Sequence, residues 1–517
     1  MKLISEPNIT VKMRRMRERV RWQHSELQQR GIDQTRLALE NAPQEFSEFS
    51  FLVLGDSGTG RHRSSSPQRQ VAQQLMNHQQ GAEFILHTGD VVYLVGSSEQ
   101  YRENFIKPYH EWIVGDDYHD IAYDKMVFKL PFLPVLGNHD YYDLPPLLGL
   151  VAGITGPLRY ALRSYVDIDV SWHGSYQGDA FARAFIDYLK GVSGFRLAQH
   201  LDEHYQGYLD GTRCLSYRPK QYTRVPNRYY QFRYGGIDFF ALDSNTFNQP
   251  LPLSITDEDR PSREALQAQR QRLEDEKADL LRQAAELTMN PLDEDGREEI
   301  TEELEQIDEQ IYDIDKQLDG NTLPVVDTEQ LNWLQERLIA SWQNPDVRGR
   351  ILFFHHPPYV TESTKWCQGQ TLAVRLHLRQ VLDAVAAEVG DIARGAPLVN
   401  LVLNGHAHCM EYIKTEDTGH GDAHIPFVIC GGSGYSLRRQ RDEGPHLQEN
   451  FHGEDRTVAT SHLFLGRTGK GSTLKRPYTG LRVDIGSGKA PAIMLTPLVA
   501  EKYDSQWNHY EVDSIKV

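Results

Sequence analysis

Five short polar motifs follow apolar runs at separate points along this chain of 517 residues. The runs are short, rich in Val, Ile, Leu and Phe, and typical of buried strands. The motifs are Asp56-Ser57-Gly58, Gly89-Asp90-Val91-Val92-Tyr93, Gly137-Asn138-His139-Asp140, His355-His356-Pro357 and Gly405-His406-Ala407-His408. Because ligands in α/β folds gather at the carboxyl ends of strands, we expect these motifs to lie together.

The apolar runs alternate with helix-prone stretches. Predicted strands cover residues 49–54, 83–87, 132–136, 236–242, 350–354 and 398–403, and predicted helices cover residues 68–79, 328–341 and 372–388. This alternation predicts α/β layers, in which helices cover buried sheets.

The motifs offer carboxylate, phenolate, amide and imidazole groups, which suit a pair of metal ions. Asp90 is the natural bridge between two ions, because it follows a glycine at a sharp strand exit. Tyr93 can turn back toward the same metal, and Asn138 offers an amide oxygen. His406 and His408 point the same way only in an extended or looped backbone. Two metals about 3.5–4 Å apart activate a bridging water and bind phosphate-ester oxygens, so we predict a dinuclear metallohydrolase.

The overall composition argues against some partners. Net charge is −17, from 72 acidic and 55 basic residues, whereas nucleic-acid and anionic-membrane binders are usually basic. We therefore expect a small-molecule partner, no nucleic acid and no membrane. The four cysteines form no CxxC pair and are expected to be buried thiols. With no apolar signal-peptide stretch visible, we expect a soluble, cytoplasmic protein.

Two stretches interrupt the core pattern. Residues 141–228 are rich in Tyr, Gly, Pro and His, and an insertion beside such a motif predicts a cap over the site. Residues 10–40 are charged and helix-prone. The thin apolar face of this segment favours a solvated or packed helical extension over a membrane-surface helix.

Residues 258–320 carry a heptad pattern. Leucines recur every seven residues at Leu266, Leu273, Leu280 and Leu287, and steps of four and three link Ile300, Leu304, Ile307, Ile311, Ile314 and Leu318. Asn290-Pro291 and Asp295-Gly296 are expected to break the helix between them. The pattern predicts an antiparallel coiled-coil hairpin whose arms reach about 38 Å from the body. An arm that closes on itself and an arm that docks a second copy or a protein partner both remain open.

The motifs resemble those of the metallophosphoesterase (calcineurin-like) superfamily, in particular its purple acid phosphatase branch. Most of the superfamily begins with Asp-x-His, whose histidine binds the first metal, whereas Gly58 stands at that third position here. Purple acid phosphatases also have Asp-x-Gly and add a tyrosine in Gly-Asp-x-x-Tyr, where Tyr93 stands. The resemblance covers roughly residues 48–435, with Asp140 where Glu is frequent.

The resemblance implies a ligand set for two metal ions. The first site, Fe(III) in that branch, would take Asp56, Asp90, Tyr93 and His408. The second site, which holds Fe(II), Zn or Mn, would take Asp90, Asn138, His355 and His406. His139 would bind the phosphate beside Asn138 and is the candidate for protonating the leaving oxygen, while His356 is a candidate pocket residue.

The fold we predict from these points is a four-layer αββα sandwich of two mixed sheets. The predicted parts are a helical N-terminal extension (1–46), a catalytic domain (47–257 and 321–500) with its cap (141–228), the hairpin (258–320) and a C-terminal tail (501–517). The predicted activity is acid-phosphatase-like hydrolysis of phosphomonoesters by a hydroxide that bridges the metals. A phosphodiesterase of cyclic-nucleotide or nuclease type, and a scaffold with a vestigial site, are the alternatives.

Overall fold

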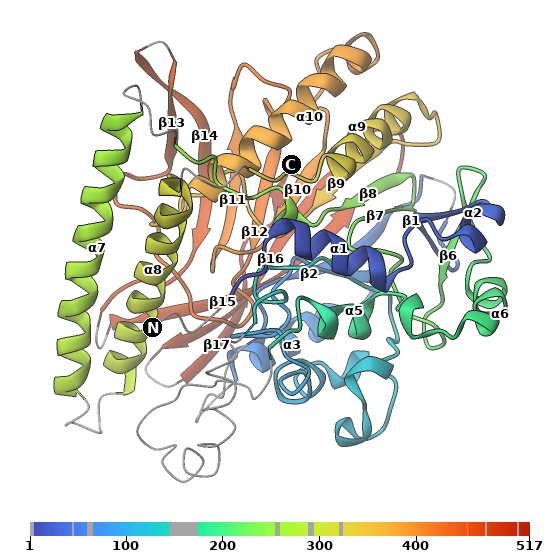
Figure 1. Ribbon diagram of the computed structural model, residues 1–517, viewed down its shortest axis with the longest axis horizontal. Helices are drawn as coiled ribbons and strands as arrows, with labels where there is room; N and C mark the ends of the chain where they lie inside the picture. The colour runs from blue at the N-terminus through green and yellow to red at the C-terminus, as the bar shows by residue number, and fades with distance from the viewer. Residues whose placement is uncertain are drawn as a thin grey trace.

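Two mixed sheets form the centre of the computed structural model (Figure 1). The structure describes residues 5–43, 46–58, 66–143, 174–253, 259–287, 294–319, 324–451, 453–470, 473–503 and 506–517. Within these residues, the smaller sheet runs β17 (Gln506–Glu511), β16 (Ile493–Tyr503), β15 (Lys475–Ile485), β2 (Phe49–Leu54), β3 (Ala82–His87) and β4 (Phe132–Pro134), and β18 (Ile515–Lys516) also pairs with β16.

The strands of the larger sheet come from residues 32–465 of the chain. Among the described residues its order is β13 (His446–Phe451), β14 (Glu454–Leu465), β11 (Met410–Thr415), β12 (Pro426–Cys430), β10 (Leu401–Asn404), β9 (Gly349–Phe353), β8 (Ile237–Ala241), β7 (Tyr230–Tyr234), β1 (Ile32–Leu39), β6 (Thr212–Tyr217) and β5 (Gly207–Leu209). In the smaller sheet β2, β3 and β4 are parallel, and in the larger sheet β8, β9, β10 and β12 are parallel.

Aromatic rings fill the space between the two sheets. Phe51 and Phe84 of the smaller sheet stack with ring centroids 5.0 Å apart. Phe84 meets Phe239 of the larger sheet edge-on at 5.3 Å, and Phe239 stacks on Phe232 at 4.6 Å. Burying such large apolar rings is a main source of stability, so this layer joins the two sheets into one body.

Helices cover the outer faces of both sheets. On the larger sheet, Leu334 and Leu338 of α9 (Thr328–Gln343) and Leu378 of α10 (Gly369–Ala393) pack with Phe240. On the smaller sheet, Leu75 of α3 (Pro67–Asn77) packs directly on Gly480 of β15. The approach is so close that a Cβ at position 480 would lie 2.7 Å from the leucine side chain. The four layers are therefore the predicted αββα sandwich (Figure 1).

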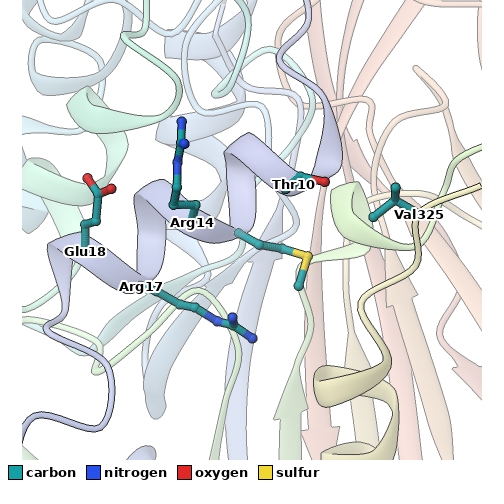
Figure 2. A pocket seen from close by; sticks show the side chains of 6 residues that line it. Thr10, Arg14, Arg17, Glu18 and Val325 are labelled. Carbon is teal, nitrogen blue, oxygen red and sulfur yellow. The ribbon is translucent and has the colours of Figure 1, made fainter.

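The N-terminal segment is only partly helical. Helix α1 (Ile9–Arg19) buries Lys12 and Met16 against the body, and Lys12 Nζ donates to Glu6 at 2.6 Å. Arg14 and Arg17 lie on its outer side, beside a pocket of about 430 Å³ (Figure 2). That pocket is lined by Thr10, Met13, Arg14, Arg17, Glu18 and Val325. None of the helices in the described ranges combines the length and apolar content needed to cross a membrane.

Two expected end segments belong to the sheets. After α2 (Ser25–Gln29), β1 pairs in parallel with both β6 and β7, so the prediction of helix up to residue 46 is wrong there. Arg36 on β1 donates to the carboxylate of Asp210 at 2.8 Å, and Asp210 lies far from it along the chain. The expected C-terminal tail is also wrong: β16 pairs with β17 and β18, which extend the smaller sheet.

The described parts of residues 141–228 do not form a cap alone. β5 and β6 make one edge of the larger sheet. Helices α5 (Asp179–Phe185) and α6 (Gly194–His204) precede these strands, and Phe185 of α5 stacks with Phe132 of β4 at 5.8 Å. The prediction that the whole segment is a cap is wrong for these residues, because backbone pairing places them in the sandwich. Residues 144–173 lie outside the described residues.

Helices α7 (Arg260–Leu287) and α8 (Glu294–Leu318) lie side by side (Figure 1). Leu273, Leu280, Ile300, Ile307 and Ile314 are buried between them. Because α8 begins at Glu294, Asp295-Gly296 lies in its first turn and does not break the helix, contrary to our expectation; Asn290-Pro291 lies outside the described residues.

The cysteines are all thiols. Cys214, Cys409 and Cys430 are buried, whereas Cys367 is exposed, so the expectation of four buried thiols is wrong at one position. Cys367 lies in the loop before α10, where no layer covers it.

Candidate metal centre

The five motifs meet at the carboxyl ends of β2, β3, β4, β9 and β10. Backbone hydrogen bonds join the strand exits: Asp56 N donates to Gly89 O at 2.9 Å, and Gly405 N donates to His355 O at 2.9 Å. The predicted ligands are all buried, with the largest exposed fraction, 8%, at His408. Two groups of side chains here can hold a metal ion: Asp56, Asp90 and His355, and His355, His356 and His406.

The hydroxyl of Tyr93 lies at the centre of the first predicted ligand set. It donates to Asp90 Oδ2 at 2.7 Å and lies 3.0 Å from Asp56 Oδ1. His408 Nε2 is 3.1 Å from the same oxygen. One phenolic oxygen, two carboxylates and one imidazole therefore converge within hydrogen-bond distance, which is the arrangement expected of groups that share one cation.

Gly58 and Tyr93 depend on each other. A Cβ at position 58 would lie 2.5 Å from Tyr93 N and 2.6 Å from Val92 Cα. These neighbours are backbone atoms, so they cannot move aside as the end of a flexible side chain can. Any side chain at position 58 would displace the backbone that carries Tyr93.

The second predicted set surrounds the amide oxygen of Asn138. His355 Nε2 lies 2.9 Å from Asn138 Oδ1, and His406 Nδ1 lies 3.0 Å from it. His355 Nε2 is also 3.2 Å from Asp90 Oδ2. Asp90 thus contacts members of both sets, with Tyr93 on one side and His355 on the other, as a bridging carboxylate would.

The outer ring nitrogens of two histidines are held by backbone carbonyls. His355 Nδ1 donates to Thr88 O at 2.9 Å, and His408 Nδ1 donates to Ser436 O at 3.0 Å. Metal-ligating histidines commonly make such an outer hydrogen bond, which fixes the tautomer and leaves the other nitrogen for the metal. In both residues the nitrogen that remains, Nε2, points toward the carboxylates.

The charges of the site favour cations. Burial raises the pKa of Asp56 well above its usual range, and the nearby Asp90 adds to this rise. Burial lowers the pKa of His355, but Asp90 and Asp56 outweigh it and raise the pKa to about 9. Burial and the same two carboxylates raise the pKa of Tyr93. Buried carboxylates that draw protons onto their neighbours would be stabilised equally by metal ions, so the residues present fit two cations.

Three predicted ligands occupy strained backbone. Asp56, Asp90 and His406 have φ of 52°, 54° and 66°, in the left-handed region. Such positions cost about 1–3 kcal/mol each and cluster at functional sites. Here each one turns a strand exit sharply, which brings its side chain back over the end of the sheet.

Asp140 orders the loops around Asp90. Its Oδ2 accepts from Asp90 N at 3.0 Å and from Gly137 N at 2.9 Å, and its Oδ1 accepts from Val91 N at 3.2 Å. Burial raises its pKa to about 8, and the Asp90 charge contributes. From the sequence, Asp140 was noted only because it stands where the resembled family often has Glu. Its place next to His139 in the motif was the signal that it belongs to the site.

His139 and His356 have different surroundings. His139 Nδ1 donates to Leu94 O at 2.6 Å, and its ring lies 4.1 Å from that of Tyr93. Its side chain is partly exposed at the edge of the centre, as a substrate-binding group would be. Both nitrogens of His356 are engaged, Nδ1 with Ser244 Oγ at 2.7 Å and Nε2 with Asn248 Nδ2 at 3.1 Å. A pocket-lining role for His356 stays a prediction.

Further side chains reach the centre from outside the motifs. Lys365 Nζ donates to His406 Nε2 at 3.0 Å, and Gln370 Nε2 lies 2.8 Å from the same nitrogen. Tyr435 stacks on Tyr93 with ring centroids 4.0 Å apart. Sequence reasoning missed Lys365 and Gln370 because they lie just before α10 and in its first turn and form no recurring pattern. Tyr435 follows the apolar run of β12, which was the signal available for it.

A mixed α/β sandwich with carboxylates, imidazoles and a phenol gathered at its strand ends defines a candidate dinuclear metal centre. No protein-family model and no curated protein sequence matches the chain. Several solved structures are similar to it. A purple acid phosphatase from yellow lupin (Lupinus luteus) seeds is 12% identical, with a TM-score of 0.43, over 92% of this chain and 55% of that one. This chain thus spans about half the length of the lupin enzyme.

Two further structures are similar. PhoD is 10% identical, with a TM-score of 0.38, over 92% of this chain and 70% of that one. A dimetal phosphatase from Danio rerio is 11% identical, with a TM-score of 0.31, over 81% of this chain and 98% of that one. We base the functional proposal on the geometry of the site.

Proposed function

We propose that this chain is a dinuclear metal-dependent phosphoesterase that hydrolyses small phosphomonoesters. The observation that carries the proposal is the convergence of Asp56, Asp90 and His408 on the Tyr93 hydroxyl, with a second set around Asn138. Asp90 joins the two sets. The complete and buried ligand set favours an enzyme over a scaffold with a vestigial site, because a decayed site should have lost ligands.

The two sets suit different ions. Carboxylate and phenolate oxygens of Asp56, Asp90 and Tyr93, with His408, would hold Fe(III). The imidazoles and the amide of the second set would hold Fe(II), Zn or Mn. When bound, such a pair supplies a hydroxide nucleophile at neutral pH and neutralises charge on the phosphoryl oxygens.

The chain's own residues would orient the ester. Asn138 and His139 follow β4 side by side, so both can contact a phosphoryl group placed over the metals. The Nδ1–H of His139 is fixed on Leu94 O, which leaves Nε2 to face the substrate. Protonation of the leaving oxygen then requires His139 as imidazolium, and burial lowers its pKa, so this role favours acidic conditions.

Removing one ligand tests the site. Asn138→Ala or His406→Ala should lower turnover of a phosphomonoester by more than about 100-fold, since even outer-shell changes cost 10–100-fold. Asn508→Ala, on the exposed face of β17, is the matched control and should keep full activity. Circular dichroism checks that each variant is folded. Full activity in folded Asn138→Ala would refute the assignment, and a panel that also contains phosphodiesters tests the alternative substrate class.

The iron assignment has its own test. Iron bound to Tyr93 should give a visible phenolate charge-transfer band, which Tyr93→Phe should abolish. Tyr435→Phe is the control, because its hydroxyl donates to Glu305 and its loss should leave the band in place. A stoichiometrically iron-loaded protein without the band would exclude the phenolate ligand.

A further inference from the structure

Helix α8 covers the metal centre with two carboxylates. Glu309 Oε1 pairs with Lys365 Nζ at 2.6 Å and lies 3.9 Å from His406 Nε2. One turn earlier, Glu305 Oε1 accepts from Tyr435 OH at 2.8 Å. Residues four apart share one face of a helix, so both carboxylates project from α8 toward the centre.

The surface that faces these carboxylates is cationic. The Lys365 side chain is 3% exposed, and its ammonium group contacts the predicted ligand His406. The guanidinium of Arg438, which is also buried, lies 3.9 Å from Glu305 Oε2. Lysine and arginine are the side chains that proteins use to bind phosphate oxygens. Two buried cations beside a metal centre therefore make a site for an anion, and α8 fills it with carboxylates.

Polar contacts fix the C-terminal half of α8 on the body. Asp313 accepts from Gly369 N at 2.7 Å and from Gln370 N at 3.0 Å, at the start of α10. Glu6 accepts from Lys316 Nζ at 2.7 Å. These contacts hold Glu309, one turn before Asp313, at a defined position over Lys365. The cover is thus part of the fold and not a chance approach of a surface helix.

We propose that Lys365 binds the phosphoryl group of the substrate, and that Glu309 competes with the substrate for this position. In the arrangement described here, the Glu309 carboxylate blocks the centre. An incoming phosphate ester would pair with the ammonium group of Lys365. It would displace the Glu309 carboxylate together with the part of α8 that carries it. This inference rests on the proposed function, because the competing anion is a phosphate ester only if the centre hydrolyses one.

Charge-removing variants test the competition. The probe is inorganic phosphate, titrated calorimetrically into the full-length, metal-loaded chain. Glu309→Gln removes the competing charge at nearly constant volume and should tighten phosphate binding by roughly fivefold. Asp308→Asn is the matched control: it removes a carboxylate from the neighbouring position, where Asp308 is 57% exposed and pairs with Lys277 of α7. Its phosphate affinity should equal that of the wild type.

A double variant separates the role of Lys365 from that of Glu309. Lys365→Met in the Glu309→Gln background should weaken phosphate binding by roughly tenfold relative to Glu309→Gln alone, and in this background the substitution leaves no charged Glu309 without its partner. Thermal unfolding and metal content show whether each variant is intact. Two results would overturn the inference: Glu309→Gln binding phosphate no more tightly than Asp308→Asn, or the double variant binding it as tightly as Glu309→Gln.

The measurements distinguish a failure of this inference from a failure of the proposed function. If the chain is no phosphoesterase, the wild type takes up no metal pair or hydrolyses no phosphate ester, and both ideas fall. If only the inference is wrong, the wild type binds metal and turns over substrate, while Glu309→Gln leaves phosphate affinity unchanged.

Discussion

Gly58→Ala is the substitution that tests the geometry of the first ligand set most directly. The new Cβ would lie 2.5 Å from Tyr93 N, 2.6 Å from Val92 Cα and 2.8 Å from Val92 C, whereas ordinary contacts begin at 3.4 Å. The backbone of residues 92 and 93 must therefore shift by about 0.9 Å. Overpacking of this kind costs about 1–3 kcal/mol of folding free energy.

The same shift should damage the metal centre more than the fold. The Tyr93 hydroxyl meets Asp90, Asp56 and His408 at 2.7, 3.0 and 3.1 Å, so a displacement near 1 Å takes it out of reach of at least one of them. A misplacement of about 1 Å can cost on the order of 100-fold in rate. We expect Gly58→Ala to stay folded, lose metal from the first site and lose about two orders of magnitude in turnover.

Three measurements read out this prediction. Chemical denaturation gives the free energy of unfolding, elemental analysis gives the metal content, and steady-state kinetics gives turnover. Gly390→Ala is the matched control, because a Cβ there meets nothing within 4 Å and the position lies inside α10. It should be neutral or stabilising by about 0.5–1 kcal/mol. Wild-type stability, metal content and turnover in Gly58→Ala would refute the link between Gly58 and Tyr93.

Two further predictions concern the stability of other parts of the chain. His200 lies 2.9 Å from Asp187; burial lowers the pKa of His200, but Asp187 outweighs it and raises that pKa. The charged pair therefore stabilises the fold below the unfolded-state pKa of about 6.5, and this stability is lost as pH rises through the folded-state value. His200→Gln should lower the melting temperature more at pH 6 than at pH 9, and an equal loss at both would contradict this. Ile307→Ala should cost about 2–4 kcal/mol between α7 and α8, where Ile307 is 3% exposed. Hydrogen exchange should then quicken in α7 and α8 and not in β2; unchanged exchange in the helices would disprove the packing.

The central strands could be predicted because their signal is local. Residues 49–54 were expected as a strand and form β2, and the run at 83–87 lies within β3, because each is a continuous apolar run between turn residues. β1 lacked that signal. Its charged residues resemble a helix surface, and Arg36 finds its partner Asp210 only after the strands have paired. Strand formation there is decided by tertiary contacts, which override local propensity.

The motifs of the site could be predicted for a related reason. A polar motif at a strand end is visible in the sequence, and parallel pairing of β2, β3 and β4 brings three such ends to one edge. The side chains that surround the motifs gave no such signal. Glu309 lies in a heptad pattern and resembles the charged flank of any coiled coil. Only the packing of α8 on the body distinguishes it from the exposed Asp308 beside it.

The hairpin's two faces also bear on whether it binds a partner. On an α-helix, residues two apart point in nearly opposite directions. Ile307 faces α7, so Glu305 and Glu309 must face away from α7, and there they meet Tyr435 and Lys365 of the body. A second copy or a partner protein would then have to dock mainly on the outer side of α7. Deleting residues 258–320 would have two effects together: it would remove such a surface, and it would uncover the metal centre. Charge reversal at exposed positions of α7, such as Arg282, tests docking alone, because it leaves the carboxylates over the centre in place.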